Sequence, residues 1–323
     1  MGIPLMAGDV PAAPTALSLL TAWRVDPVML VFAAACAAAY VVGVRRIGRA
    51  GGRWPRRRWV GFVVGLASLV WTSMAWPAVY GSVLFSVYST QLIVLLTVVP
   101  FLLGLGRPLE LARTSLRPGG LARLDAILSS RPGRVFTVPV VSPLLLAVVP
   151  FVVFFTGVYP ASLAHLGLLW LLHLGLVLVG LVVLVPLWES DAVAARVAYP
   201  LALLFAFIEL LADAVPGIVI RLNTHVIALG YLSELGRPWG PSLLRDQQIG
   251  GDLLWCIGEA VDVPFLALLL FAWVRSDARE AARIDDALDP APAGTAPVEM
   301  GRPWWETDAS VFGDRAGRFE RRD

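Results

Sequence analysis

The sequence has few charged residues and no lysine. Only 15% of its 323 residues are charged and all 26 basic residues are arginine, whereas a typical soluble domain is about 25% charged. A chain with so little charge cannot cover its surface with polar groups, so the composition excludes an ordinary soluble globular domain. The absence of lysine also excludes a retinal receptor, which needs a Schiff-base lysine in its last span.

Cysteine is almost as scarce. The two cysteines, Cys36 and Cys256, lie in separate apolar runs and form no CxxC pair, which excludes a disulfide framework, a zinc ribbon and a covalent haem site. HExxH and GxSxG motifs are absent too, and we expect no enzymatic activity. The net charge is only +2, and we expect no nucleic-acid partner.

What the sequence has instead is apolar runs, since 58% of its residues are hydrophobic. Seven runs are long enough to cross roughly 30 Å of hydrocarbon. They are residues 27–44, 59–79, 84–104, 136–156, 163–187, 198–221 and 250–274. We therefore predict an all-α, multi-pass protein of a bacterial plasma membrane, a bundle of seven transmembrane helices with the lipid bilayer as its solvent.

Arginine positions predict the orientation of this bundle. Seven arginines lie in residues 45–58 and six in residues 107–134, whereas residues 80–83 and 157–161 contain none. Arginine-rich short loops stay on the cytoplasmic side. We therefore predict an external N-terminal segment (1–26), a transmembrane domain (27–274) and a cytoplasmic tail (275–323) that begins as a helix and then becomes disordered.

Charged side chains inside spans are costly, and so they are candidates for a functional site. Two spans carry several of them. Glu209 and Asp213 share one face of the sixth span, while Asp252, Glu259 and Asp262 follow one stripe of the seventh. We expect these five carboxylates to line a polar cavity that opens to the outside. The alternative is structural, because buried polar groups also hold transmembrane helices together.

Histidines and one polar run complete the candidate site. His173 lies in the fifth span and His225 follows the sixth, and either could be a metal ligand or a proton partner. Packing with a satisfied hydrogen bond is the alternative for His173. Asp246, Gln247 and Gln248 precede the seventh span, where we expect them to form the outer mouth of the cavity.

Several of these features together resemble a known family. The run Asp-Gln-Gln-x-Gly-Gly at 246–251 precedes the tryptophan-bearing last span, the third span carries Gln91 and a Gly-x-Gly-Arg-Pro exit at 104–108, and the fifth carries His173. Over about residues 25–285 the chain resembles the CtaG family of cytochrome c oxidase assembly factors, in its actinobacterial branch.

This resemblance implies a role in respiratory chain biogenesis. The chain would be a membrane assembly factor for an aa-type cytochrome c oxidase, assisting formation of a copper centre on the external side. Its partners would be oxidase subunits and a copper chaperone. Copper would bind transiently, with His173 and His225 as candidate metal ligands.

One pair of positions departs from the family pattern. Typical members carry two histidines around the glutamine of the third span, whereas Tyr88 and Leu92 flank Gln91 here. If those histidines bind copper in the family, this chain lacks that ligand pair. A different class of function, a proton- or metal-ion-coupled membrane transporter, therefore stays open, since buried carboxylates also serve as proton relays.

Overall fold

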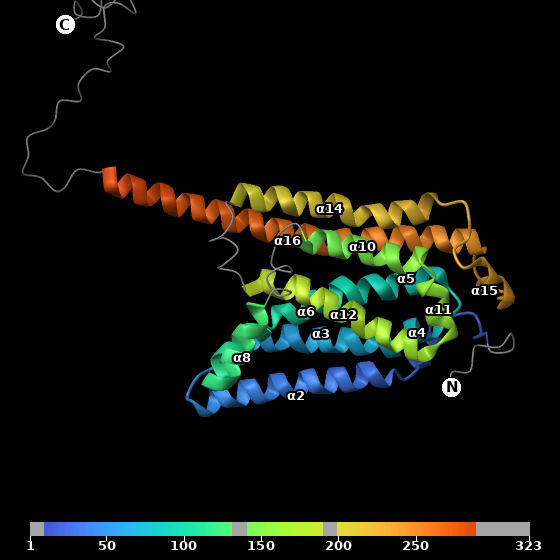
Figure 1. Cartoon of the computed structure of the whole chain (residues 1–323), viewed down its shortest axis with the longest axis horizontal. Coiled ribbons are helices and arrows are strands. Elements are labelled where there is room, and N and C mark those ends of the chain that lie inside the picture. Colours follow the sequence, from blue (N-terminus) through green and yellow to red (C-terminus); the bar gives the residue numbers. More distant parts are fainter. Residues whose placement is uncertain (1–9, 131–140, 190–198, 289–323) are drawn as a thin grey trace, which may run out of the picture. The chain divides into compact units, whose positions relative to one another are not determined.

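The computed structural model describes residues 10–130, 141–189 and 199–288, and every regular element within them is a helix (Figure 1). The helices are, in chain order, α1 (Ser18–Thr21), α2 (Pro27–Arg49), α3 (Arg56–Met74), α4 (Trp76–Tyr80), α5 (Phe85–Ile93), η1 (Val94–Val98), α6 (Val99–Leu105), α7 (Pro108–Ser115), α8 (Pro118–Leu128), α10 (Val141–Phe155), α11 (Val158–Ala164), α12 (Leu166–Glu189), α14 (Tyr199–Leu222), α15 (Leu229–Glu234) and α16 (Leu243–Leu288). The predicted all-α class is confirmed for this part of the chain.

The long helices coincide with the predicted apolar segments, apart from residues 136–140 and 198, which lie outside the described residues. By length and composition, four described stretches could each cross a membrane. They are Pro27–Arg49, Arg56–Tyr80, Phe85–Leu105 and Leu166–Leu184. Leu145–Phe155 and Val158–Ala164, bent by 63°, add a fifth if they form one broken span. Helices α14 and α16 occupy the sixth and seventh segments, and the count of seven spans remains a prediction.

Close helix packing explains why small residues interrupt these apolar helices. Helix α12 packs against η1 and α6, and a Cβ atom added to Gly180 would lie 2.0 Å from the carbonyl oxygen of Leu96. Helices α14 and α16 meet at Gly217 and Gly251, where an added Cβ would lie 2.7 Å and 2.6 Å from the other glycine's carbonyl oxygen. Only glycine allows backbones to approach this closely.

The third apolar segment is not a uniform α-helix. It is α-helical over α5, widens to a π-helix over Val94–Val98 and returns to α-helix in α6. Pro100 follows the π-turn and has no N–H to donate to the preceding turn, so the hydrogen-bond ladder is already broken there. Gln91, just before the π-turn, is buried, and its side-chain amide donates to the carbonyl oxygen of Thr72 at the end of α3 (2.9 Å).

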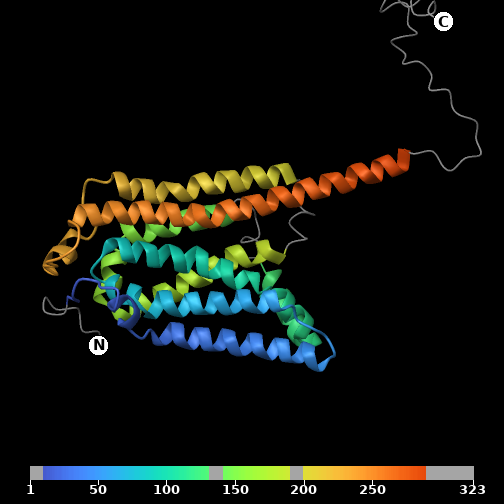
Figure 2. The same ribbon diagram turned by 180° about the vertical axis from the view of Figure 1, so that it is seen from behind.

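The two ends of the helix bundle differ in composition. Helix α2 and helix α16 begin at one end, where α4, α11 and α15 also lie, and we call this the amino-terminal end (Figures 1 and 2). The turn between α2 and α3, with helix α8, lies at the opposite, arginine-rich end. The predicted topology would place these two ends on opposite membrane faces.

The last helix crosses a boundary between two parts of the chain. The compact unit ends at Trp273, and α16 continues beyond it to Leu288. The disorder predicted for the end of the tail concerns residues 289–323, which lie outside the described residues.

Candidate functional site

Asp246 lies in the first turn of α16, but its carboxylate serves another helix. It accepts hydrogen bonds from the amide of Phe85 (2.8 Å), the amide of Ser86 (3.3 Å) and the hydroxyl of Ser86 (2.5 Å). These groups form the first turn of α5, whose N-terminus has no capping side chain of its own. A buried carboxylate there satisfies free amides and meets the positive end of the helix dipole, so Asp246 fixes the start of α5 onto α16.

Gln247 makes the corresponding attachment to the loop that follows α14. Its side-chain oxygen accepts from the amide of Ile227 (2.7 Å), and its side-chain nitrogen donates to the carbonyl oxygens of His225 (3.1 Å) and Asn223 (3.3 Å). Gln247 is fully buried, so losing these bonds would leave polar groups unsatisfied. Gln248 makes one exposed bond, accepting from Arg245 (3.3 Å). Whether the three residues also line a cavity mouth stays a prediction.

Arg237 precedes the Asp-Gln-Gln run at 246–251, and the sequence suggested no role for it. Its side chain is 3% exposed, and it donates to the carbonyl oxygens of Trp239 (2.6 Å) and Pro241 (2.9 Å). The guanidinium lies 3.7 Å from the Asp246 carboxylate. A buried charge of this kind needs a counterion, and Asp246 supplies it. Trp239 in turn donates to the carbonyl oxygen of Pro11 (2.9 Å). Side chains of residues 237–247 therefore bond to the N-terminal segment, to α5 and to the loop after α14.

His173 is buried in α12 and pairs with Asp26. The ring Nδ1 lies 2.9 Å from Oδ2 of Asp26, and both side chains are under 5% exposed. The other oxygen of Asp26 accepts from the amide of Met29 (2.9 Å), which caps the N-terminus of α2. The sequence identified His173 but missed Asp26. The missed signal was the pair Asp26-Pro27 directly before an apolar run, which is typical of a helix start.

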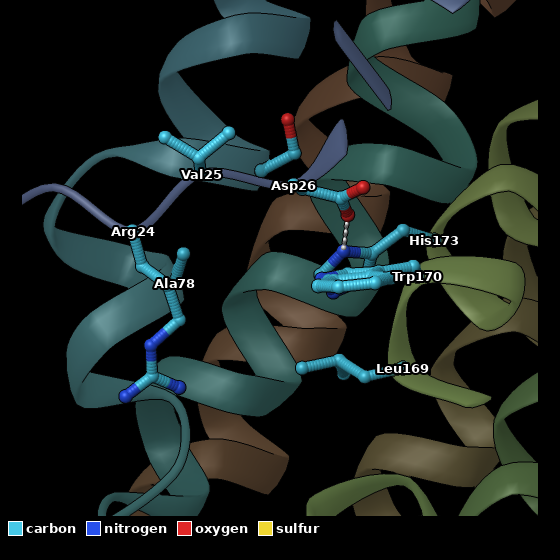
Figure 3. Close-up of a pocket in the computed structure, with 8 residues that line it drawn as sticks. Arg24, Val25, Asp26, Ala78, Leu169, Trp170 and His173 are labelled. Carbon is cyan, nitrogen blue, oxygen red and sulfur yellow. Dashed lines mark hydrogen bonds and ion pairs between the residues drawn. The ribbon is translucent and has the colours of Figure 1, made fainter. Parts of the chain in front are cut away.

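A small hollow lies beside this pair (Figure 3). Its volume is about 190 Å³, counting the space at its open mouth. It is lined by Arg24, Val25, Asp26, Ser73, Ala78, Leu169, Trp170 and His173. In Figure 3, the Asp26 carboxylate meets the His173 ring, whereas the Arg24 side chain extends away from this pair. The carboxylate and the imidazole therefore form one bonded pair beside the start of α2.

Arg24 is half-buried at the edge of this hollow. Its backbone amide donates to the carbonyl oxygen of Met74 (2.7 Å), which fixes the segment before α2 onto the end of α3. Burial lowers the pKa of the Arg24 guanidinium, and the nearby Tyr231 hydroxyl acts in the opposite direction. An arginine pKa starts so high that the group stays charged at any physiological pH.

His225 lies in the loop between α14 and α15 and is exposed. Its amide donates to the side chain of Asn223 (2.9 Å), and its carbonyl accepts from Gln247. No described contact joins its ring to His173. Over the residues that the structure describes, no group of three or more His, Cys, Asp or Glu side chains is placed to hold a metal ion. The two histidines therefore do not form a shared metal centre with further such ligands in this part of the chain.

Two of the five predicted cavity carboxylates have partners. Asp252 pairs with Arg221 at 2.9 Å across α14 and α16, and Glu259 accepts from the indole nitrogen of Trp255 (3.1 Å) on its own helix. Both interactions are at least partly exposed. The side chains of Glu209, Asp213 and Asp262 lie outside the described residues, so the proposed cavity between α14 and α16 stays a prediction.

The two positions that depart from the family pattern, Tyr88 and Leu92, hold buried side chains that pack in the core. Tyr88 is buried against the rings of Phe154 and Tyr159, and its hydroxyl shares a hydrogen bond with Ser162 (2.8 Å). Leu92 lies in the hydrophobic core. Neither side chain offers a nitrogen ligand, so a metal at this level of the third segment would have to rely on other residues.

Comparison with known proteins identifies the family. The family model described as cytochrome c oxidase caa3 assembly factor (Caa3_CtaG) matches residues 38–276. Uncharacterized proteins of Mycobacterium bovis and Mycobacterium tuberculosis are each 28% identical over 290 residues, and one of Mycobacterium leprae is 29% identical. These alignments cover 87% of this chain but only 44% of each relative's length. No solved structure matches the chain.

Proposed function

Because the chain belongs to the family of cytochrome c oxidase caa3 assembly factors, we propose that it assists the assembly of an aa-type oxidase in a bacterial plasma membrane. We further propose that it acts at the stage where a copper centre forms, on the external side. The observation that carries this proposal is the Asp246–Gln247 network, because it joins α16 to α5 and to the loop after α14 at one end of the bundle.

The sidedness of the proposal follows from arginine placement. The arginine-rich turn between α2 and α3 lies at the end opposite the Asp246–Gln247 network and the Asp26–His173 pair. The positive-inside rule would put that arginine-rich end in the cytoplasm. The amino-terminal end would then face outwards, as would the N-terminal segment. This is the side from which we propose that the oxidase receives copper.

A client-binding role is favoured at the amino-terminal end. Side-chain hydrogen bonds there fix loops that would otherwise be free to move, since Asp246, Gln247 and Arg237 are all buried and bonded to backbone groups. A surface whose loops are already ordered loses less conformational entropy when a partner binds. We propose that oxidase subunits, and a copper chaperone with them, bind this end.

The copper part of the proposal rests on His173 and His225. We propose that copper binds to them transiently and is not stored. Copper(I) prefers thiolate and thioether ligands, and carboxylates suit harder ions. Cys36 and Cys256 lie far apart in the sequence, in α2 and α16. Equilibrium copper binding to the purified chain, with His173→Ala and His225→Ala beside it, tests this. Binding that neither variant weakens would remove the two histidines as ligands.

Deletion of the gene in its host tests the assembly role. We expect the membranes to lose oxidase activity and the haem a signal of the reduced-minus-oxidised spectrum. Partial rescue by added copper would support copper delivery, and loss without rescue would support a subunit chaperone. An unchanged oxidase would contradict an assembly role. Copper or proton flux in proteoliposomes, abolished by Glu259→Gln, would then favour the transporter.

A further inference from the structure

The arginine-rich end of the bundle carries positive charge that no acidic side chain nearby in the sequence balances. Between Asp26 and Glu110 the chain has no Asp or Glu. Six arginines around the turn between α2 and α3 are exposed, and no described residue forms a side-chain hydrogen bond or ion pair with them. We call them the arginine surface: Arg45, Arg46, Arg49, Arg53, Arg56 and Arg57.

A seventh arginine, Arg58, has a different role, because it holds the turn in place. Its guanidinium donates to the carboxylate of Glu110 (2.6 Å) and lies over the Trp54 ring, 4.7 Å from the centroid. The indole of Trp54 donates to the hydroxyl of Tyr40 (2.9 Å), which donates to the carbonyl oxygen of Gly106 (2.9 Å). The arginine surface therefore stands on a fixed frame, and an ordered surface loses less conformational entropy when a partner binds.

The fold itself gains nothing from the charges at the start of α3. Arg56, Arg57 and Arg58 are its first three residues, and its first turn has no acidic residue. Cations at the positive end of a helix dipole are unfavourable, and neighbouring like charges repel one another. The positive-inside rule accounts for the presence of these arginines but does not remove the repulsion. An anion from outside the chain would offset it.

The arginine surface lies where the exposed apolar surface of two helices stops. On α2, the exposed side chains of Val41 and Val42 come directly before the first of these arginines. On α3, Trp59 and Val60 follow directly after the last of them and are 48% and 51% exposed. In a membrane, such a boundary lies at the level of the lipid headgroups, where tryptophan is enriched. The anions present at that level are headgroup phosphates.

We propose that the arginine surface binds the phosphate headgroups of anionic phospholipids and selects these lipids over zwitterionic ones. Guanidinium groups form charge-assisted, often bidentate, hydrogen bonds to phosphate, and each basic residue at the membrane surface adds to the attraction. Anionic and zwitterionic phospholipids both carry a phosphate, so the selection rests on net headgroup charge. This lipid-binding surface goes beyond the proposed assembly role and does not depend on it.

Lipid retention in mixed micelles tests the proposal. A micelle has no sides, so a role of these arginines in topology cannot produce the result. The full chain is purified in dodecyl maltoside with equal amounts of phosphatidylglycerol and phosphatidylcholine, and the retained lipids are counted by native mass spectrometry. We expect phosphatidylglycerol to exceed phosphatidylcholine by roughly tenfold. The triple variant Arg53→Gln, Arg56→Gln, Arg57→Gln should lose most of this preference, whereas lysine at the same three positions should keep it.

A matched control removes the same charge from another part of the chain. Arg275, Arg279 and Arg283 of α16 are exposed, but Asp277 and Glu280 alternate with them, so they form no surface of one sign. Changing these three arginines to glutamine should leave the lipid preference unchanged. The proposal is overturned if the parent chain retains both lipids equally, if the first glutamine variant keeps the preference, or if the control loses as much of it.

Two further measurements separate the proposal from simpler explanations. Arg45→Gln with Arg46→Gln, at the other edge of the arginine surface, should also lower the preference, which makes the result independent of how the first variant folds. Inorganic phosphate is then compared with chloride at equal ionic strength. If the two salts reduce retained phosphatidylglycerol equally, by screening, the lipid surface is supported. If phosphate displaces the lipid and chloride does not, the occupant is a free anion and the proposal is overturned.

Discussion

The carboxylate of Asp246 and the backbone amide of Phe85 lie 2.8 Å apart, although 161 residues separate them along the chain. The carboxylate therefore caps a helix to which it does not belong. Asp246 and Gln247, from the polar run at 246–251, bond to backbone groups of α5 and of the loop after α14. The run therefore has a structural role.

Removal of the Asp246 carboxylate should destabilise the fold. Asp246→Ala leaves the amides of Phe85 and Ser86 and the guanidinium of Arg237 without their acceptor, and we expect a loss of about 1–3 kcal/mol or more. The measurement is the unfolding midpoint of the purified chain in maltoside micelles. Gln248→Ala, which removes one exposed bond, is the control and should change the midpoint little. Equal midpoints for both variants would contradict the capping role.

Gln247 should control the mobility of the loop between α14 and α15. In Gln247→Ala the Ile227 amide loses its acceptor, the side-chain oxygen of Gln247. We therefore expect hydrogen exchange at Ile227 to become roughly tenfold faster. Exchange measured by mass spectrometry on peptides covering residues 223–228 reports this. In the same experiment peptides from α3 should keep their rates. A uniform rise across the chain would mean global destabilisation instead.

Gly180 should tolerate no side chain. A Cβ atom there would lie 2.0 Å from the carbonyl oxygen of Leu96 and 2.5 Å from the ring of Pro100, so Gly180→Ala must push α12 away from the third segment. Overpacking of this kind costs about 1–3 kcal/mol. Gly175→Ala is a matched control on the same helix, because nothing lies within 4 Å of its added Cβ. We expect a lower unfolding midpoint for the first variant only.

Two carboxylates of α16 provide the test of the predicted site. We expect Asp252→Asn and Glu259→Gln to abolish function with little loss of membrane insertion, because removing a charge from a span adds no insertion cost. Complementation of the deletion strain, scored by oxidase activity and by the amount of protein in the membrane, measures both. Glu234→Gln on the exposed side of α15 is the control. If the first two variants complement fully, the carboxylates are not part of the site.

Local signals account for the parts of the fold and site that the sequence predicted well. In lipid, the backbone N–H and C=O groups of a long uncharged apolar run must pair within the segment, as they do in a helix. The helices were therefore predictable from composition and length. The Asp-Gln-Gln run was distinctive enough to indicate the family, and the family match over residues 38–276 confirms it. His173 was also found, because a histidine inside an apolar helix is conspicuous.

The partners of these residues were not predictable in the same way. Asp26 was taken as the last residue of an N-terminal segment, whereas in the structure it pairs with His173 across 147 residues of sequence. His225 was grouped with His173 as a metal ligand, and no described contact joins their rings. The π-helical turn after Gln91 was likewise missed. The spacing of apolar residues does not indicate where the backbone hydrogen bonds change from the α-helical to the π-helical pattern.

The sequence by itself determined which segments are helical, where the arginines gather and which family the chain resembles. Each of these follows from composition, run length or a contiguous motif, and none needs knowledge of distant neighbours. The tertiary structure alone decided that Asp246 caps α5 and that Asp26 orients His173. Such pairings depend on which helices pack together, and packing depends on shape at contacts such as Gly180 on Leu96, which no local pattern encodes.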